Sequence, residues 1–520
     1  MNDEQRKGAT TSADEPLDSV QRDIVHLAKG GALKFAGSIG TTGSGFVVGV
    51  ILTRFLDAAN FGLFRLAYVF AEVVARVSIL GLHSSTLRFV PIAARAGDHA
   101  RLWGILQLTC GVPALIGMGT GAATFLLADT IALQGFQQPE LAPVLRLMSA
   151  AIPLMVIVAS GEAVTRAFHQ IAYSVYGIDI VLPISKLLLT LALLFAGLGL
   201  TGAALAHVLA EAIAAAVIIG LVHKIFSLVR SLRAAVYPIR EIVSHSFPIF
   251  FTRLLSLFAG RLETFALAYF HVMEVVGVFS IALSLSRLSE LFAGALNRVS
   301  LPLISDSYAQ GGTDRILPIF RSGTRWSVIA TLPTFLVVVI FAEHLLAIFG
   351  EEFRAGKTAL LILSLGPLIQ SSSWLASGII TMTGNARLNT LNAALSMAVT
   401  IILDLSLIPR FGLTGAAMAA AGTISFLSLL RLSEVFWLFR MQPYTVELLK
   451  PLAAGAAAAA VALALDHGLP IEQLQIRGAL GIAALVSTYV AVLWFLGASD
   501  DDEPILELLR ERLPFLRAGR

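Results

Sequence analysis

Long apolar runs, separated by short polar segments, recur along nearly the whole chain. A helix that crosses a bilayer needs about 20 mainly apolar residues. About fourteen runs meet this criterion. They lie near residues 33–56, 62–82, 103–128, 142–168, 172–197, 201–223, 243–270, 274–297, 323–349, 357–383, 388–408, 412–438, 446–466 and 476–497. No polar segment is long enough for a folded domain outside the membrane, so the pattern predicts an all-α polytopic membrane protein.

The two ends of the chain are more polar than the runs. Residues 1–15 are polar, and apolar residues recur at helical spacing over 16–29, which predicts a helix lying on the membrane surface before the first span. Near the other end, four acidic residues at 500–503 precede Pro504. Acidic residues and proline are typical of a helix N-terminus, and this explains the acids better than a metal site.

Basic residues are unevenly distributed between alternate polar segments, and this predicts the orientation. One set holds Arg6, Lys7, Arg22, Lys29, Arg88, Arg95, Arg101, Lys224, Arg230, Arg233, Arg240, Arg298, Arg315, Arg321, Arg387, Arg440, Arg510, Arg512, Arg517 and Arg520. The alternate set holds only Arg354, Lys357 and Arg410. Since basic segments stay on the cytoplasmic side, both termini are predicted to be cytoplasmic, with an even number of spans.

Composition agrees with a membrane location and excludes several classes of protein. Hydrophobic residues make up 57% of the 520 residues and charged residues only 14%, whereas soluble domains carry about 25% charged residues. The net charge is +3, and the basic residues form no stripe with interleaved aromatics, so nucleic acid is not an expected partner. The single cysteine, Cys110, cannot form a disulfide within the chain.

The sequence holds no signature of catalysis. We find no His-Glu-x-x-His, no Gly-x-Ser-x-Gly and no cluster of cysteine and histidine ligands. Residues 350–358 resemble a phosphate-binding loop, but the spacing between their glycines is one residue too long and no strand precedes them. We therefore expect no enzyme activity, no cofactor, no bound metal and no use of ATP.

Similar segments recur about 214 residues apart. Residues 199–204 (Gly-Leu-Thr-Gly-Ala-Ala) are repeated at 412–417, and Phe61-Gly62-Leu63-Phe64 is echoed by Val276-Gly277-Val278-Phe279. Each repeat covers about six predicted helices, and an even number makes the repeats parallel. This predicts two six-helix lobes around a central cavity, followed by two further helices.

The predicted organisation has five parts. They are a cytoplasmic tail with an interfacial helix (1–32), an N-terminal lobe (33–225), a C-terminal lobe (226–440), two extra transmembrane helices (441–497) and a cytoplasmic tail (498–520).

Several segments resemble one known family in their order and spacing. Thr53-Arg54-Phe55-Leu56 and Phe61-Gly62-Leu63-Phe64 resemble the first hairpin of the polysaccharide and oligosaccharide flippases. Leu80-Gly81-Leu82 with Leu87-Arg88-Phe89, and Leu346 to Phe353 with Leu360 to Leu363, resemble later junctions of that family. The resemblance covers roughly residues 25–440. Asp57 is a departure, because relatives usually have glycine there.

This family belongs to the multidrug/oligosaccharidyl-lipid/polysaccharide exporter superfamily. The resemblance implies a bacterial inner-membrane flippase that moves polyprenyl-pyrophosphate-linked oligosaccharide by alternating access during surface polysaccharide assembly. Its implied partners are the lipid-linked oligosaccharide, membrane lipids and a polysaccharide polymerase machinery. Two alternatives remain, a cation-coupled small-molecule (drug) antiporter of the same superfamily and a membrane polysaccharide polymerase.

Charged residues inside the predicted spans are the candidate functional residues, because charge is costly in hydrocarbon unless it faces a cavity or a partner. Arg54, Arg65, Arg146, Arg166 and Arg253 lie near predicted helix ends, where the side chain can reach the interface. Arg76, Lys186, Arg261 and Arg287 are the candidate substrate-binding residues, since a pyrophosphate needs cations that stay charged in a dry cavity.

Two further patterns concern pairing between charges. Glu162 and Arg166 are spaced to pair on one helix face, as are Glu72 and Arg76. The repeat also places Glu72 beside the position of Arg287, and Arg76 at the position of Glu290, with reversed charges. These four residues are therefore a candidate gate on the cytoplasmic side, in which Glu72 pairs with Arg287 and Arg76 pairs with Glu290. The alternative is pairing within each helix.

Overall fold

The computed structural model describes residues 14–226, 235–290, 300–301, 303–308, 312–313, 315–468 and 474–497, and every regular element within them is helical. Among these residues, twelve segments are long and apolar enough to cross a membrane. One of them, Arg387–Phe439, contains two helices joined at Gly412, whose φ is 52°. The prediction of an all-α polytopic membrane protein is confirmed, and the count of fourteen helices stays a prediction.

The N-terminal half contains fourteen helical segments. They are α2 (Asp14–Phe55), α3 (Ala58–Ser78), α4 (Leu82–Arg95), α5 (His99–Leu106), η1 (Gln107–Gly111), α6 (Val112–Leu126), α7 (Ala128–Thr130), η2 (Ile131–Gly135), α8 (Leu141–Ser149), α9 (Ala151–Ala167), α10 (Ile171–Ser174), η3 (Val175–Val181), α11 (Leu182–Phe195) and α12 (Gly199–Ile225).

The described helices of the C-terminal half follow in the same manner. They are α13 (Ile239–Ala259), α14 (Leu262–Phe270), α15 (Met273–Ser286), η5 (Arg287–Ser289), α17 (Ile316–Ile340), α18 (Ala342–Phe349), η6 (Glu351–Gly356), α19 (Lys357–Ser371), α20 (Trp374–Met382), α21 (Ala386–Phe439), η7 (Val446–Leu448), α22 (Leu449–Gly468) and α23 (Leu474–Leu496).

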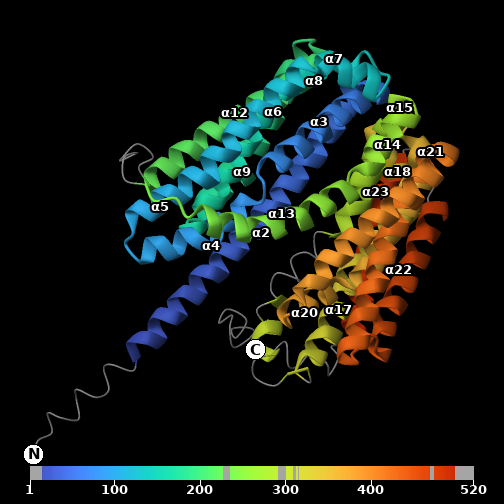
Figure 1. Ribbon diagram of the computed structural model, residues 1–520. Helices are drawn as coiled ribbons and strands as arrows, with labels where there is room; N and C mark the ends of the chain where they lie inside the picture. The colour runs from blue at the N-terminus through green and yellow to red at the C-terminus, as the bar shows by residue number, and fades with distance from the viewer. Residues whose placement is uncertain are drawn as a thin grey trace, which may run out of the picture.

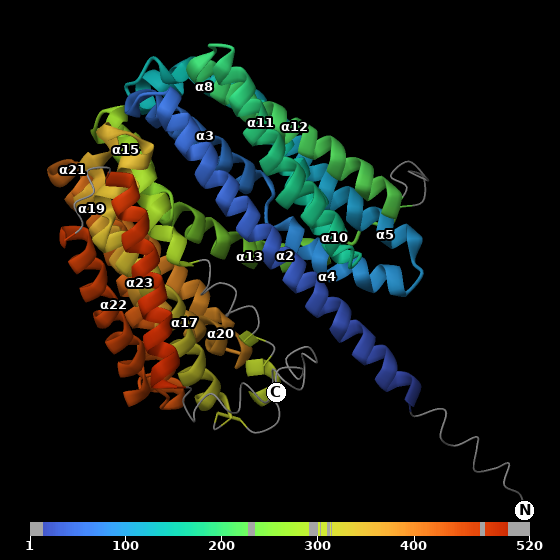
Figure 2. The ribbon, with the colours of Figure 1, turned by 180° about the vertical axis from the view of Figure 1, so that it is seen from behind.

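The helices form two groups, one that contains α3 to α12 and one that contains α14 to α23. The groups converge at one end and diverge at the other (Figures 1 and 2). The starts of α3 and α15 lie at the converging end, and the start of α2 lies beyond the diverging end. Helix α13 runs from one group to the other. Its Ser246 hydroxyl lies 2.6 Å from that of Ser85 on α4, and its Thr252 hydroxyl lies 3.1 Å from that of Thr390 on α21.

Helix α2 is continuous over 42 residues. The helix predicted over 16–29 and the first predicted span are therefore one helix, and the expected break between them is absent from this described segment. The helix continues through Gly30 and Gly31 at the predicted boundary. The location of 16–29 at the membrane surface stays a prediction.

The two halves meet most closely where α3 crosses α15. A Cβ atom added at Gly62 would lie 2.0 Å from the carbonyl oxygen of Met273, and one added at Gly277 would lie 2.2 Å from that of Ala58. Both glycines therefore allow backbone-to-backbone contact that no other residue permits. These glycines occupy equivalent positions of the sequence repeat, so the repeat brings its own two copies together at this crossing.

Polar bonds reinforce the converging end. The Arg54 guanidinium donates hydrogen bonds to the carbonyl oxygens of Ile348 (2.8 Å) and Ala347 (2.9 Å), in the last turn of α18. A cation suits a helix C-terminus, where carbonyl groups lack partners within the helix. The backbone N–H of Ala58 donates to the Glu352 carboxylate at 2.9 Å, which satisfies the start of α3 in the same way.

Asp57, the departure from the family pattern, has a local structural role. Its carboxylate accepts a hydrogen bond of 2.7 Å from the backbone N–H of Asn60, and it is the N-cap of α3. Aspartate is among the preferred N-cap residues, because its short side chain reaches an unpaired N–H of the first turn. The turn between α2 and α3 is therefore stabilised by the residue that departs from the pattern.

The α3–α15 crossing generates a stability prediction. Gly62→Ala should lower the melting temperature of the detergent-purified protein, because the new Cβ forces the two backbones apart at a cost of about 1–3 kcal/mol. Gly119→Ala on α6 is the control, since nothing lies within 4 Å of a Cβ added there. A melting temperature lowered no more by Gly62→Ala than by Gly119→Ala would show that the contact does not hold the two groups together.

Candidate functional site

A buried carboxylate on α3 joins the two groups of helices. Glu72, only 7% exposed, forms ion pairs with Arg76 on the same helix at 2.8 Å and with Arg261 at 3.1 Å. Arg261 lies at the break between α13 and α14, where it precedes the first residue of α14. The break is what turns this guanidinium away from the path of α13 and towards α3.

Further cations surround this ion pair. Arg65 lies within electrostatic range of Glu72, Arg261 and Arg287. Its guanidinium also lies 5.2 Å from the ring centre of Tyr68, and the Lys186 ammonium lies 5.1 Å from the same ring. Arginines stacked on an aromatic ring keep their charge while being partly dehydrated. Three guanidinium groups, those of Arg65, Arg76 and Arg261, thus surround the one carboxylate of Glu72.

A second polar cluster continues from Tyr68 into the N-terminal group. The Tyr68 ring packs edge-on against His207 with 5.0 Å between ring centres, and His207 lies 4.0 Å from the Glu211 carboxylate. Lys186 interacts electrostatically with Glu211 and with Glu72. His207 and Glu211 are buried, at 2% and 6% exposure. The cations around Glu72 and this cluster thus form one connected charged region.

The four predicted substrate-binding residues fall into two environments. Arg76 and Arg261 share Glu72, with side chains 60% and 19% exposed respectively. Lys186 and Arg287 are half-buried, and Arg287 interacts electrostatically with Arg65 and with Glu263. The structure therefore brings Arg261 and Lys186 into the region around Glu72, together with Arg65, and Arg287 lies within electrostatic range of Arg65.

The predicted pairing within the helix between Glu72 and Arg76 is confirmed. Among the described side chains, Glu72 contacts Arg76 and Arg261 rather than Arg287 in this conformation. Glu290 interacts electrostatically with Arg287 of its own segment. In this conformation, no ion pair between the described side chains joins Glu72 to Arg287 or Arg76 to Glu290. The pairing of these residues in another conformation stays a prediction.

Sequence reasoning missed Arg65, which it treated as a residue near a helix end. Its interior position follows from α3 itself, on which Arg65, Tyr68, Glu72 and Arg76 recur at intervals of three or four residues. Residues with this spacing lie on one face of a helix. A polar face continued over three turns was the signal that could have identified Arg65 as an interior residue.

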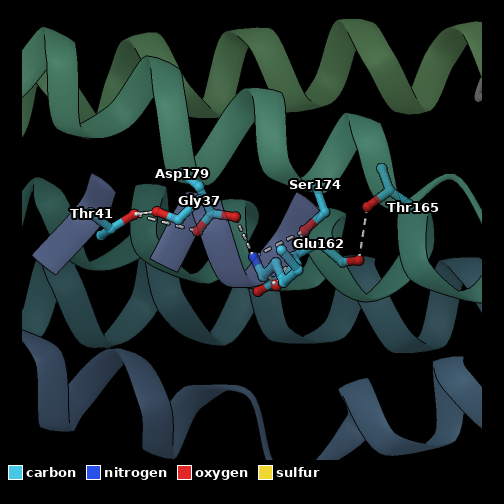
Figure 3. A network of polar contacts seen from close by, with 7 residues as sticks. Gly37, Thr41, Glu162, Thr165, Ser174 and Asp179 are labelled. Carbon is cyan, nitrogen blue, oxygen red and sulfur yellow. Dashed lines mark hydrogen bonds and ion pairs between the residues drawn. The ribbon is translucent and has the colours of Figure 1, made fainter. Parts of the chain in front are cut away.

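The charged pair predicted between Glu162 and Arg166 is wrong. Glu162 instead forms an ion pair of 3.3 Å with Lys34 of α2, and Lys34 also binds Asp179 at 2.8 Å (Figure 3). A Cβ added at Gly37 would lie 2.8 Å from the Cβ of Asp179, so this glycine lets α2 approach η3. A tertiary contact between helices here replaces the local pair that the spacing suggested.

Two buried acids lie on the C-terminal side, and the sequence placed both inside predicted spans but assigned neither to substrate binding nor to the gate. Asp404 on α21 is 1% exposed, and Glu263 on α14 is 6% exposed. The two carboxylates interact electrostatically. Within the described residues, neither oxygen of Asp404 has a hydrogen-bond partner. Their position on facing helices depends on how α14 packs against α21, which the local sequence does not reveal.

Comparison with known proteins identifies the family. The model of the family described as "Polysaccharide biosynthesis protein" matches residues 27–308, which is more than half of the chain. The protein therefore belongs to the polysaccharide biosynthesis protein family, as its sequence motifs suggested.

Curated relatives match parts of the chain. The chain is 26% identical over 262 residues to the probable flippase AglR of Haloferax volcanii, covering 48% of this chain and 53% of that protein. It is 23% identical to the probable low-salt glycan biosynthesis flippase Agl15 of the same organism, covering 32% and 35%. The chain thus spans between about a third and about a half of the length of these relatives.

Solved structures with low sequence identity share the fold. The lipid II flippase MurJ, in an inward closed conformation, matches 88% of this chain and 97% of its own length, with a TM-score of 0.68 and 16% identity. An inward-facing multidrug resistance MATE transporter matches 75% of this chain and 92% of its own length, with a TM-score of 0.62 and 15% identity. Both matches show that this chain has a similar fold to these structures.

The network of Figure 3 generates the second prediction. Lys34→Met should destabilise the protein by about 1–3 kcal/mol, because it leaves the half-buried carboxylates of Glu162 and Asp179 without their cation. The readout is the melting temperature in detergent. Lys357→Met is the matched control, since Lys357 pairs with Glu343 at the surface, where both side chains are about half exposed and the pair is worth about 0–1 kcal/mol. Equal losses in the two variants would contradict the prediction.

Proposed function

We propose that this protein is a flippase that translocates polyprenyl-pyrophosphate-linked oligosaccharide across a bacterial inner membrane during surface polysaccharide assembly. The observation that carries the proposal is the excess of guanidinium groups around Glu72, formed by Arg65, Arg76 and Arg261. Membership of the polysaccharide biosynthesis family and the names of the relatives support it.

The charge arrangement suits a pyrophosphate. Arginine stays charged at any accessible pH, and its planar donors match phosphate oxygens in pairs. Arg261 is held against Glu72 at 3.1 Å, and Arg65 lies within electrostatic range of Glu72, Arg261 and Arg287. In our proposal, a bound dianion would replace the carboxylate of Glu72 as the partner of Arg261 and would share these guanidinium groups.

Alternating access requires one closed and one open end, and the arrangement of helices supports this. The two helix groups meet closely at the α3–α15 crossing and diverge towards the end where α2 begins (Figure 2). The basic segments favour a cytoplasmic N-terminus. In our proposal the structure therefore represents a conformation that faces the cytoplasm, with the lobes formed by residues 33–225 and 226–440.

The proposed gate follows from this assignment. In a conformation that faces the cytoplasm, helix groups that diverge keep Glu72 away from Arg287 and Arg76 away from Glu290. When the groups close on the cytoplasmic side, both pairs can form, and Glu72 then exchanges Arg261 for Arg287. The pairs would stabilise the outward-facing conformation only, which is what a two-state switch requires.

The proposed function predicts a specific accumulation. Deleting the gene should cause a polyprenyl-linked glycan to accumulate on the cytoplasmic side, measured by mass spectrometry of extracted lipids. Complementation with Arg261→Gln should reduce translocation about tenfold or more, because a charge-assisted bond to phosphate is worth about 1.5–3 kcal/mol. Arg410→Gln, an exposed arginine outside this region, is the control and should complement fully.

The purified protein provides the second part of this test. In proteoliposomes, translocation of the lipid-linked glycan should proceed without ATP. Absence of accumulation in the deletion strain, or translocation that requires ATP hydrolysis by this chain, would exclude the proposed function.

The gate predicts a charge-exchange result. Glu72→Arg and Arg287→Glu should each impair translocation at least tenfold, because each places like charges together on the cytoplasmic side. The double variant should recover part of the activity. A second double variant, Glu72→Arg with Arg261→Glu, is the control, because it exchanges the charges of the ion pair that is present in this structure. Recovery with the Arg261 exchange alone would show that Glu72 acts through its ion pair with Arg261 and not through the gate.

A further inference from the structure

An apolar cavity of about 390 Å³ lies along a face of α3 that adjoins its charged face. Seven of its eight lining side chains are apolar, and they come from α3, α13, α14 and the end of η2. The lining consists of Phe70, Val73, Val74, Val77, Thr120, Phe136, Phe258 and Phe265. Its size falls in the range of about 300–1,000 Å³ that is typical of small-molecule sites.

The one polar group of the lining is already satisfied. The Thr120 hydroxyl lies 3.0 Å from the Ser78 hydroxyl and donates to the carbonyl oxygen of Gly117 at 3.2 Å. A sugar or a phosphate placed in the cavity would therefore lose its hydrogen bonds to water and gain none from the walls. The cavity can accept only a hydrocarbon ligand.

The cavity and the charged region lie along neighbouring faces of α3. Phe70, Val73, Val74 and Val77 recur at intervals of three or four residues and line the cavity. The polar face of the same helix carries Glu72, one residue before Val73. Adjacent residues on a helix differ by about 100° in direction, so the two faces adjoin along the helix.

The break between α13 and α14 brings the two regions together. Phe258 and Phe265, which line the cavity, lie three residues before and four residues after Arg261, which binds Glu72. The same short segment thus supplies both a cation to the charged region and two aromatic rings to the apolar cavity. A ligand that spans both must have an anionic head directly attached to an apolar chain.

We propose that the cavity binds the isoprenoid segment that adjoins the pyrophosphate of the lipid-linked substrate, while Arg261 binds the pyrophosphate itself. This inference rests on the proposed function and adds a binding site for the lipid portion. The aromatic and branched walls suit a branched, unsaturated chain, and the neighbouring guanidinium groups select an anionic head over a zwitterionic one.

Cysteine protection tests the site directly, because Cys110 is the only natural cysteine. The full chain carries Cys110→Ser and Val74→Cys and is reconstituted in phosphatidylcholine nanodiscs, where a hydrophobic maleimide labels position 74. A long-chain polyprenyl pyrophosphate should slow labelling at least fivefold. Inorganic pyrophosphate and phosphatidylglycerol should not slow it. The control is Leu126→Cys in the same background, since Leu126 is 77% exposed on α6 and should stay unprotected.

A second variant fills the cavity without relying on cysteine chemistry. Val74→Trp should lower the affinity for the polyprenyl pyrophosphate at least tenfold, measured by the saturation of a fluorescent isoprenoid pyrophosphate. Leu126→Trp should leave that affinity unchanged. The melting temperature of each variant establishes that the protein is folded.

The outcomes separate this proposal from the proposed function. Binding of the polyprenyl pyrophosphate to the unaltered chain, with no protection at position 74 and no effect of Val74→Trp, would overturn the cavity assignment and leave the flippase proposal intact. Equal protection by phosphatidylglycerol would show that the cavity is an ordinary lipid site. Failure of the unaltered chain to bind any polyprenyl pyrophosphate would overturn both.

Discussion

The close crossing of α3 and α15 is the contact on which the arrangement of the two helix groups depends. Apolar side chains give helices little reason to associate in hydrocarbon, so close backbone packing at small residues must supply the attraction. Gly62 and Gly277 allow this packing on both helices. Glu72 and Arg287 each lie ten residues further along (72 − 62 and 287 − 277). At about 1.5 Å per residue, each charge is about 15 Å from the crossing, so a modest change in crossing angle separates or joins them.

The parts of the fold that follow from local sequence were predictable. Apolar runs predicted the membrane-spanning helices, because a bilayer imposes their length and composition whatever their neighbours are. The repeat identified Gly62 and Gly277 as equivalent positions, and they meet in the structure. The continuity of α2 was not predictable in this way, since polarity marks where a helix leaves the membrane and not where it ends.

The parts of the site that depend on packing could not be read from the sequence. Glu162 has Arg166 at pairing distance along its own helix, yet it binds Lys34, because Gly37 lets α2 approach. Arg261 owes its position to the break between α13 and α14, which no proline within the break announces. Spacing along one helix predicts which charges can pair, and the neighbouring helices decide which of them do.

In the proposed mechanism, the position of Glu72 links substrate binding to the movement of the helix groups. Its carboxylate tethers α3 to the start of α14 through Arg261 and also accepts a bond from Arg76 of its own helix. An anion that binds Arg261 competes with Glu72 for that guanidinium, and Glu72 then keeps Arg76 as its partner. In that mechanism the tether is weakest when substrate is bound, and the energy of binding is available to shift the proposed equilibrium between conformations. A ligand can shift such an equilibrium only by its difference in affinity for the two states. Competition for a single guanidinium supplies that difference directly, without requiring a signal from a distant site.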